Sequence, residues 1–107
     1  MNATISWPAS TQETVDHICR LVQCKTTTPP GNELTAILEI KEILDAAGFP
    51  RQDYQILESA PNRVNLIARL RGDGSQRPLL LSGHVDVVPA ESDRWSCDPY
   101  CGQIKDG

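Results

Sequence analysis

The chain has 107 residues, of which 39% are hydrophobic and 22% are charged, a composition typical of one soluble globular domain. Its net charge is -4 and its basic residues form no cluster, which argues against nucleic acid as a partner. No apolar run approaches the ~20 residues needed to cross a bilayer, and Met1–Thr4 lacks the basic start of a signal peptide. We therefore expect a cytoplasmic protein with no membrane partner.

The first predicted element is a helix that begins at Ser10. Ser10 and Glu13 fit the capping-box pattern, in which each side chain binds the other residue's backbone amide. One apolar stripe then follows at helical spacing and is expected to face a core: Val15, Ile18, Cys19 and Val22. His17 lies off this stripe, so its simplest interpretation is a solvated side chain. The prolines within Thr26–Gly31 end the helix.

A second helix is expected between Asn32 and Gly48. Asn32 is a suitable N-cap, and Gly48 stands where a left-handed residue commonly follows a helix. The residues predicted to track its buried face are Leu34, Ile37, Leu38, Lys41 and Leu44.

Extended segments fill the second half of the chain. The predicted strands are Tyr54–Leu57, Val64–Leu70 and Leu79–Ser82, separated by Pro61–Asn62 and Gly72–Gly74. The third is apolar on both faces, as in the centre of a sheet covered by helices. The fold class is therefore α/β, with two helices followed by about three strands. Trp95–Gly107 has the composition of a surface loop that leads into a hairpin turn.

His84 and Asp86 follow the third predicted strand directly. Side chains two residues apart on a strand point to the same side, so the two are expected to lie close together. Histidine is the commonest zinc ligand, and a carboxylate often accepts its second ring N–H. His84 is thus a candidate metal ligand and Asp86 its partner. This spacing alone also fits a histidine beside an aspartate that binds turn amides.

The wider sequence around this pair favours the metal site. Ser82–Pro89 reads S-G-H-V-D-V-V-P, and Trp95, Asp98–Tyr100 and Lys105–Gly107 follow it. Together these segments resemble the co-catalytic zinc amidohydrolases and exopeptidases, which include acetylornithine deacetylase, succinyl-diaminopimelate desuccinylase, aminoacylase and glutamate carboxypeptidase. Pro29–Glu33 is similar to the family's P-P-G-x-E segment. The phenylalanine that the family has after D-P is replaced by Tyr100.

The resemblance implies that residues 1–107 are the N-terminal portion of a catalytic domain, part of a sheet flanked by helices. Its motifs stop before the family's bridging-aspartate motif. By resemblance, His84 binds one of two zinc ions, with cobalt as an alternative metal, and Asp86 is the catalytic residue that orients it. The implied complete enzyme is a homodimer that hydrolyses amide bonds of N-acyl amino acids or small peptides. The isolated chain is expected to be inactive.

Two alternatives stay open at the level of sequence. The first is a short non-catalytic paralogue or binding module that is stabilised by another chain. The second is a structural zinc site made by the four cysteines Cys19, Cys24, Cys97 and Cys101. Neither pair has the C-x2-C spacing of a zinc ribbon, and the family does not use cysteines at these positions, so the second alternative is the weaker one. The reducing cytoplasm also argues against a disulfide framework.

Overall fold

The computed structural model of the protein describes residues 4–107. These residues form two compact units, one made by the chain up to Lys25 together with Ala90–Gly107, the other by Thr26–Pro89. Residues 1–3, which enter the argument against a signal peptide, lie outside the described residues. Among residues 4–107 no helix is both long enough and apolar enough to cross a bilayer.

In the first unit, helix α1 spans Trp7–Val22 and begins earlier than the sequence predicts. Its N-cap is Ser6, and a proline lies in its first turn, where the missing amide proton costs nothing. The predicted capping box at Ser10 and Glu13 is therefore wrong: Ser10 lies inside the helix and its amide donates to the Ser6 carbonyl at 2.9 Å.

The predicted apolar stripe of α1 contains two half-buried residues, Val15 and Cys19, and two exposed ones, Ile18 and Val22. No residue of α1 is buried, and Ile18 and Val22 are 53% and 39% exposed. His17, expected to be solvated, is instead half-buried.

The C-terminal part of this unit is a loop, as predicted. It contains the short helix η2, Ser92–Arg94, and a tight turn in which the Cys101 amide donates to the Asp98 carbonyl at 3.0 Å. Asp106 and Gly107 have φ angles of 55° and 87°. Residues 102–107 contain no turn or strand in the described structure, so the hairpin turn expected there stays a prediction.

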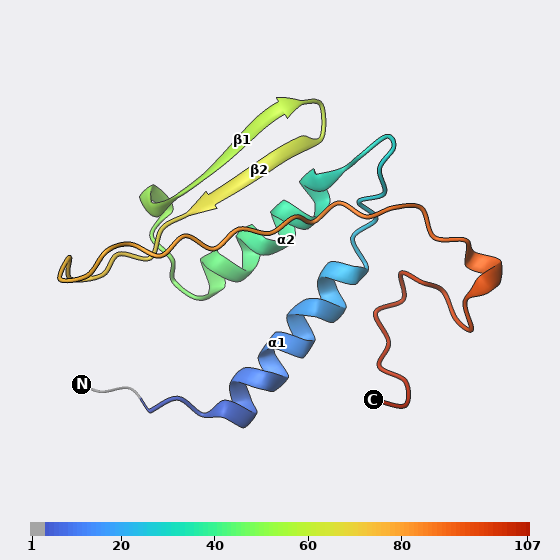
Figure 1. Cartoon of the computed structure of the whole chain (residues 1–107), viewed down its shortest axis with the longest axis horizontal. Helices are drawn as coiled ribbons and strands as arrows, with labels where there is room; N and C mark the ends of the chain where they lie inside the picture. Colours follow the sequence, from blue (N-terminus) through green and yellow to red (C-terminus); the bar gives the residue numbers. More distant parts are fainter. Residues whose placement is uncertain (1–3) are drawn as a thin grey trace. The chain divides into compact units, whose positions relative to one another are not determined.

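In the second unit, helix α2 spans Glu33–Ala46 and agrees with the prediction at both ends (Figure 1). Asn32 is its N-cap, and Gly48 follows the helix with a φ of 75°. The Leu34 amide, in the first turn, donates to the Asn62 carbonyl at 3.2 Å. The turn of a hairpin therefore supplies an acceptor for a helix amide that has none within the helix.

Two of the predicted strands form an antiparallel hairpin (Figure 1). Strand β1 spans Tyr54–Ala60, after the short helix η1 at Arg51–Asp53, and strand β2 spans Arg63–Ala68. Asn62 makes the turn possible with a φ of 63°, a conformation that asparagine tolerates better than most residues.

A small core lies between α2 and this hairpin. Its buried apolar residues are Ala36, Ile37, Tyr54 and Val64, with exposures of 2%, 5%, 1% and 7%. The buried face of α2 begins one residue earlier than predicted, because Glu33 is buried while Leu38 is 45% exposed. A hydrophobicity pattern cannot detect this rotation, since it gives no reason to bury a glutamate.

Polar contacts bind Tyr54 to the end of α2. The Tyr54 hydroxyl donates to Asp45 at 2.6 Å, and the Lys41 ammonium lies 2.6 Å from the other carboxylate oxygen. The hydrogen bond from Lys41, followed by that from Tyr54, lowers the pKa of Asp45. The hydrogen bond to Asp45, helped by burial, raises the pKa of Tyr54.

The third predicted strand does not form a strand in this structure. The sheet contains β1 and β2, and Leu79–Ser82 belongs to an extended segment, orange in Figure 1. Leu79, Leu80 and Leu81 are 82%, 87% and 82% exposed. A strand requires a hydrogen-bonded neighbour, and among residues 4–107 none pairs with these leucines. The fold class, a small α/β arrangement, is as predicted.

Candidate functional site

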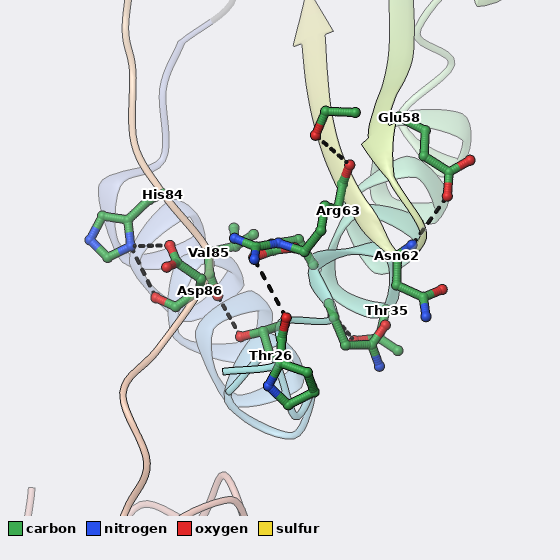
Figure 2. Close-up of polar contacts among 12 residues, drawn as sticks. Thr26, Thr35, Glu58, Asn62, Arg63, His84, Val85 and Asp86 are labelled. Carbon is green, nitrogen blue, oxygen red and sulfur yellow. Dashed lines mark hydrogen bonds and ion pairs between the residues drawn. The ribbon is translucent and has the colours of Figure 1, made fainter. Parts of the chain in front are cut away.

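His84 and Asp86 lie side by side, as the spacing predicts, although the backbone here is extended and not part of a strand (Figure 2). His84 Nδ1 lies 3.0 Å from Asp86 Oδ1 and 3.0 Å from the Asp86 carbonyl oxygen. Both neighbours are acceptors, so Nδ1 carries the hydrogen and donates it. In the neutral imidazole the lone pair is then on Nε2, on a side chain that is 84% exposed. A metal ion can approach this nitrogen from solvent.

The backbone around this pair is anchored at the Thr26–Thr28 segment. The Thr28 amide donates to the Val87 carbonyl at 2.8 Å, and the Val87 amide donates to the Thr26 carbonyl at 3.2 Å. These bonds form an isolated parallel bridge between Thr27 and Val87. The Thr26 hydroxyl, on a residue only 2% exposed, donates to the Val85 carbonyl at 2.5 Å. The anchors lie on either side of Asp86 in sequence.

A cavity of about 330 Å³ opens beside the pair. Its walls come from α2, from the hairpin and from residues 83–86. The polar residues among those that line this cavity are Glu33, Ser59, Arg63, Asn65, His84 and Asp86. The segment 83–86 thus faces a partly polar space whose other walls belong to α2 and the β1–β2 hairpin, which together form the scaffold.

An ion pair closes the scaffold side of this cavity. Arg63 Nε lies 2.7 Å from Glu33 Oε2, and Arg63 Nη1 donates to the Pro30 carbonyl at 3.5 Å. The guanidinium also fills the space beside Gly31, whose φ is 89° and on which a Cβ would lie 2.7 Å from Arg63 Nε. The P-P-G-x-E segment thus has a structural explanation: its glycine leaves room for Arg63 and its glutamate pairs with it.

The described residues do not assemble a complete metal site. Within residues 4–107 no group of three or more His, Cys, Asp or Glu side chains is placed to hold an ion. This also removes geometric support for a structural zinc site made by the four cysteines. One exposed imidazole nitrogen fits one ligand position, whereas a hydrolytic zinc site takes about three protein ligands.

Comparison with known proteins identifies relatives that match all or most of the chain. It is 37% identical over 110 residues, covering 100% of the chain, to a succinyl-diaminopimelate desuccinylase of Parvibaculum lavamentivorans. It is 36% identical over 93 residues to the desuccinylase of Zymomonas mobilis, and 44% identical over 71 residues to an acetylornithine deacetylase of Vibrio cholerae. The chain is a homologue of these desuccinylases and deacetylases.

Each match covers most of this chain but only a small part of the relative. The Zymomonas and Vibrio matches cover 87% and 65% of this chain. The chain itself spans only 27%, 24% and 17% of the length of the three relatives, in the order Parvibaculum, Zymomonas, Vibrio. No protein-family model and no solved structure matches it at a significant level.

Sequence reasoning missed two features of this desuccinylase and deacetylase homologue. The sequence indicated Thr26 only as part of a threonine run at a helix end. It gave no sign of the hydrogen bond to Val85, because the two residues are 59 positions apart. The Glu33–Arg63 pair was equally invisible, because periodicity treats both residues as surface charges. The available signal for Glu33 was its place in the P-P-G-x-E segment.

Proposed function

We propose that this chain forms part of the catalytic domain of a zinc-dependent hydrolase that cleaves amide bonds of N-acyl amino acids or small peptides. Its homology to enzymes named desuccinylase and deacetylase supports the reaction class. The observation that carries the proposal is the orientation of His84, whose Nδ1 is held by Asp86 while Nε2 faces solvent.

In this proposal His84 holds zinc through Nε2 and Asp86 sets the direction of the ring. Donation from Nδ1 to the Asp86 carboxylate keeps the tautomer that leaves Nε2 able to bind a cation. Zinc, or cobalt in its place, supplies Lewis acidity to the scissile carbonyl. The role of Asp86 is to prevent the imidazole from turning away and to keep its hydrogen on Nδ1.

One histidine is not a sufficient ligand set, so the chain by itself is expected to be inactive. We expect no detectable hydrolysis of N-acetyl or N-succinyl amino acids by the purified chain with added zinc or cobalt. Activity that withstands repurification and disappears in His84→Ala would contradict this expectation.

The activity can be tested in a chimera. The chain would replace its matching 27% of the Parvibaculum desuccinylase, and hydrolysis of succinyl-diaminopimelate and acetylornithine would be assayed with zinc. We expect zinc-dependent activity on one of them, lost by at least about 10³-fold in His84→Ala and reduced about 10- to 100-fold in Asp86→Ala, the range usual for a carboxylate that orients a metal ligand.

His17→Ala serves as the matched control, because it removes the chain's other histidine and leaves the proposed site unchanged. A chimera that folds and binds zinc but hydrolyses neither compound would overturn the proposal and favour the non-catalytic paralogue. Activity unchanged by His84→Ala would overturn the assignment of the site.

A further inference from the structure

Two cysteines outside the site are brought together by a tight turn. The Cys101 amide donates to the Asp98 carbonyl at 3.0 Å, and the Asp98 carboxylate accepts the Tyr100 amide at 2.9 Å. Pro99 occupies the second position of this turn, where its fixed φ is favourable. The turn places Cys97 Sγ and Cys101 Sγ 3.9 Å apart, with both thiols reduced.

The turn is anchored to the end of α1 in the same unit. Gln23 Nε2 donates to the Cys101 carbonyl at 3.4 Å, and the Lys25 ammonium lies 5.7 Å from the centre of the Tyr100 ring. Gly102, with a φ of 65°, approaches the Cys19 carbonyl so closely that a Cβ would collide with it. Cys101 is therefore held against the helix and half-buried, whereas Cys97 is exposed.

From this arrangement we infer that Cys97 and Cys101 form a reversible dithiol–disulfide site that exchanges with small disulfides such as oxidised glutathione. A disulfide has an S–S length of about 2.05 Å, so closure needs a sulfur movement of about 2 Å. Exposed Cys97 is the thiol that an external disulfide can reach, and Cys101 is the thiol placed to resolve the adduct. Such a pair opens and closes with the redox state of its surroundings. It differs in this from permanent structural disulfides, which a reducing compartment disfavours.

The exchange balances in two steps. The Cys97 thiolate attacks one sulfur of oxidised glutathione, a protein–glutathione S–S bond forms, and one glutathione thiolate leaves. The Cys101 thiolate then attacks the Cys97 sulfur of this adduct, the Cys97–Cys101 bond forms, and the second glutathione leaves. In total, two electrons pass from the protein thiols to oxidised glutathione, and the two thiol protons appear on the two glutathione molecules or in solvent.

The test is a redox titration of the whole chain in glutathione buffers. After acid quenching and alkylation of the remaining thiols, mass spectrometry of the intact chain and its peptides identifies each product. We expect Cys97 and Cys101 to escape alkylation together, so that the intact chain carries two alkyl groups instead of four, lacks two hydrogen atoms and retains no glutathione. In Cys97→Ser and Cys101→Ser intramolecular closure should be lost completely, and Cys101→Ser should retain one glutathione on Cys97.

The matched control is the double variant Cys19→Ser, Cys24→Ser, which removes the thiols at α1 and keeps the turn. It should close at the same glutathione ratio as the unchanged chain. Stable glutathione adducts on Cys97 without closure would overturn the inference, as would a disulfide that includes Cys19 or Cys24. Circular dichroism of each variant reports whether it is folded. If a variant unfolds, the disulfide products of the unchanged chain still decide whether Cys97 and Cys101 close on each other.

Discussion

Two regions of the second unit are held in place in very different ways. The scaffold, α2 with the β1–β2 hairpin, has a buried core in which Tyr54 is 1% exposed. The segment that carries His84 and Asp86 follows three leucines that are more than 80% exposed, and its anchors are the hydrogen bonds to Thr26 and Thr28. Apolar burial thus fixes the scaffold, while a few backbone and hydroxyl bonds fix the candidate ligand.

The largest expected effect tests the scaffold. Tyr54→Ala should reduce the free energy of unfolding by about 3–5 kcal/mol, because it removes a fully buried aromatic ring, whereas Leu80→Ala should change it by less than about 0.5 kcal/mol. Urea unfolding followed by circular dichroism measures both. Similar losses of stability in the two variants would show that the leucine segment is packed as well as the core. The proposed difference between the scaffold and the His84 segment would then be wrong.

Gly31→Ala tests the junction between the scaffold and the loop that precedes it. We expect a loss of about 1–3 kcal/mol, because alanine must adopt a φ of 89° and its Cβ would lie 2.7 Å from Arg63 Nε. Gly48→Ala is the control, since its φ is 75° but nothing lies within 4 Å of the added Cβ. If both variants lose the same stability in urea, the Arg63 contact contributes nothing beyond the backbone strain.

Thr26→Val tests the anchor of the His84 segment. Valine keeps the shape but removes the hydroxyl donor to the Val85 carbonyl, so we expect a loss of about 1 kcal/mol, confined to this segment. Amide hydrogen exchange should show faster exchange at Val87 and Thr28 with little change in α2. Thr26→Ser retains the hydroxyl and should restore most of the protection. Uniformly faster exchange across the scaffold would contradict a local role.

The smallest expected effect is on the stability of the chain at acidic pH. The pKa of Asp45 is lowered in the folded chain, so its contribution to stability is present above the ordinary value near 3.8 and is lost as the pH falls through the lower folded value. We expect the stability of Asp45→Asn to depend less on pH below about 4 than that of the unchanged chain. Thermal melting between pH 2 and 6 measures this. Parallel pH curves would exclude Asp45 as a contributor.

Local sequence signals predicted the scaffold well. Asn32 and Gly48 mark the ends of α2, and Pro61–Asn62 marks the hairpin turn, because caps and turns are decided by adjacent residues. The start of α1 was wrong, since a proline in the first turn outweighed the capping box at Ser10. The expected strand at Leu79–Ser82 was also wrong, because an apolar run does not show whether a neighbouring strand exists.

The candidate site was predictable only where its residues are close in sequence. His84 and Asp86 are two residues apart, and their contact follows from that spacing. Thr26 and Arg63 act through contacts with distant parts of the chain, at Val85 and at Glu33 and Pro30. Such contacts depend on how the scaffold folds, so periodicity and capping rules give no indication of them.

The bond between Thr26 and Val85 has a consequence for the order of folding. It closes a loop of 59 residues, which in an unstructured chain carries an entropic cost that rises with the logarithm of loop length. Helix α2 and the β1–β2 hairpin form within that loop from contacts much closer in sequence, and once formed they shorten its flexible part. We therefore expect docking of the His84 segment to follow folding of the scaffold, so that the candidate ligand becomes oriented last.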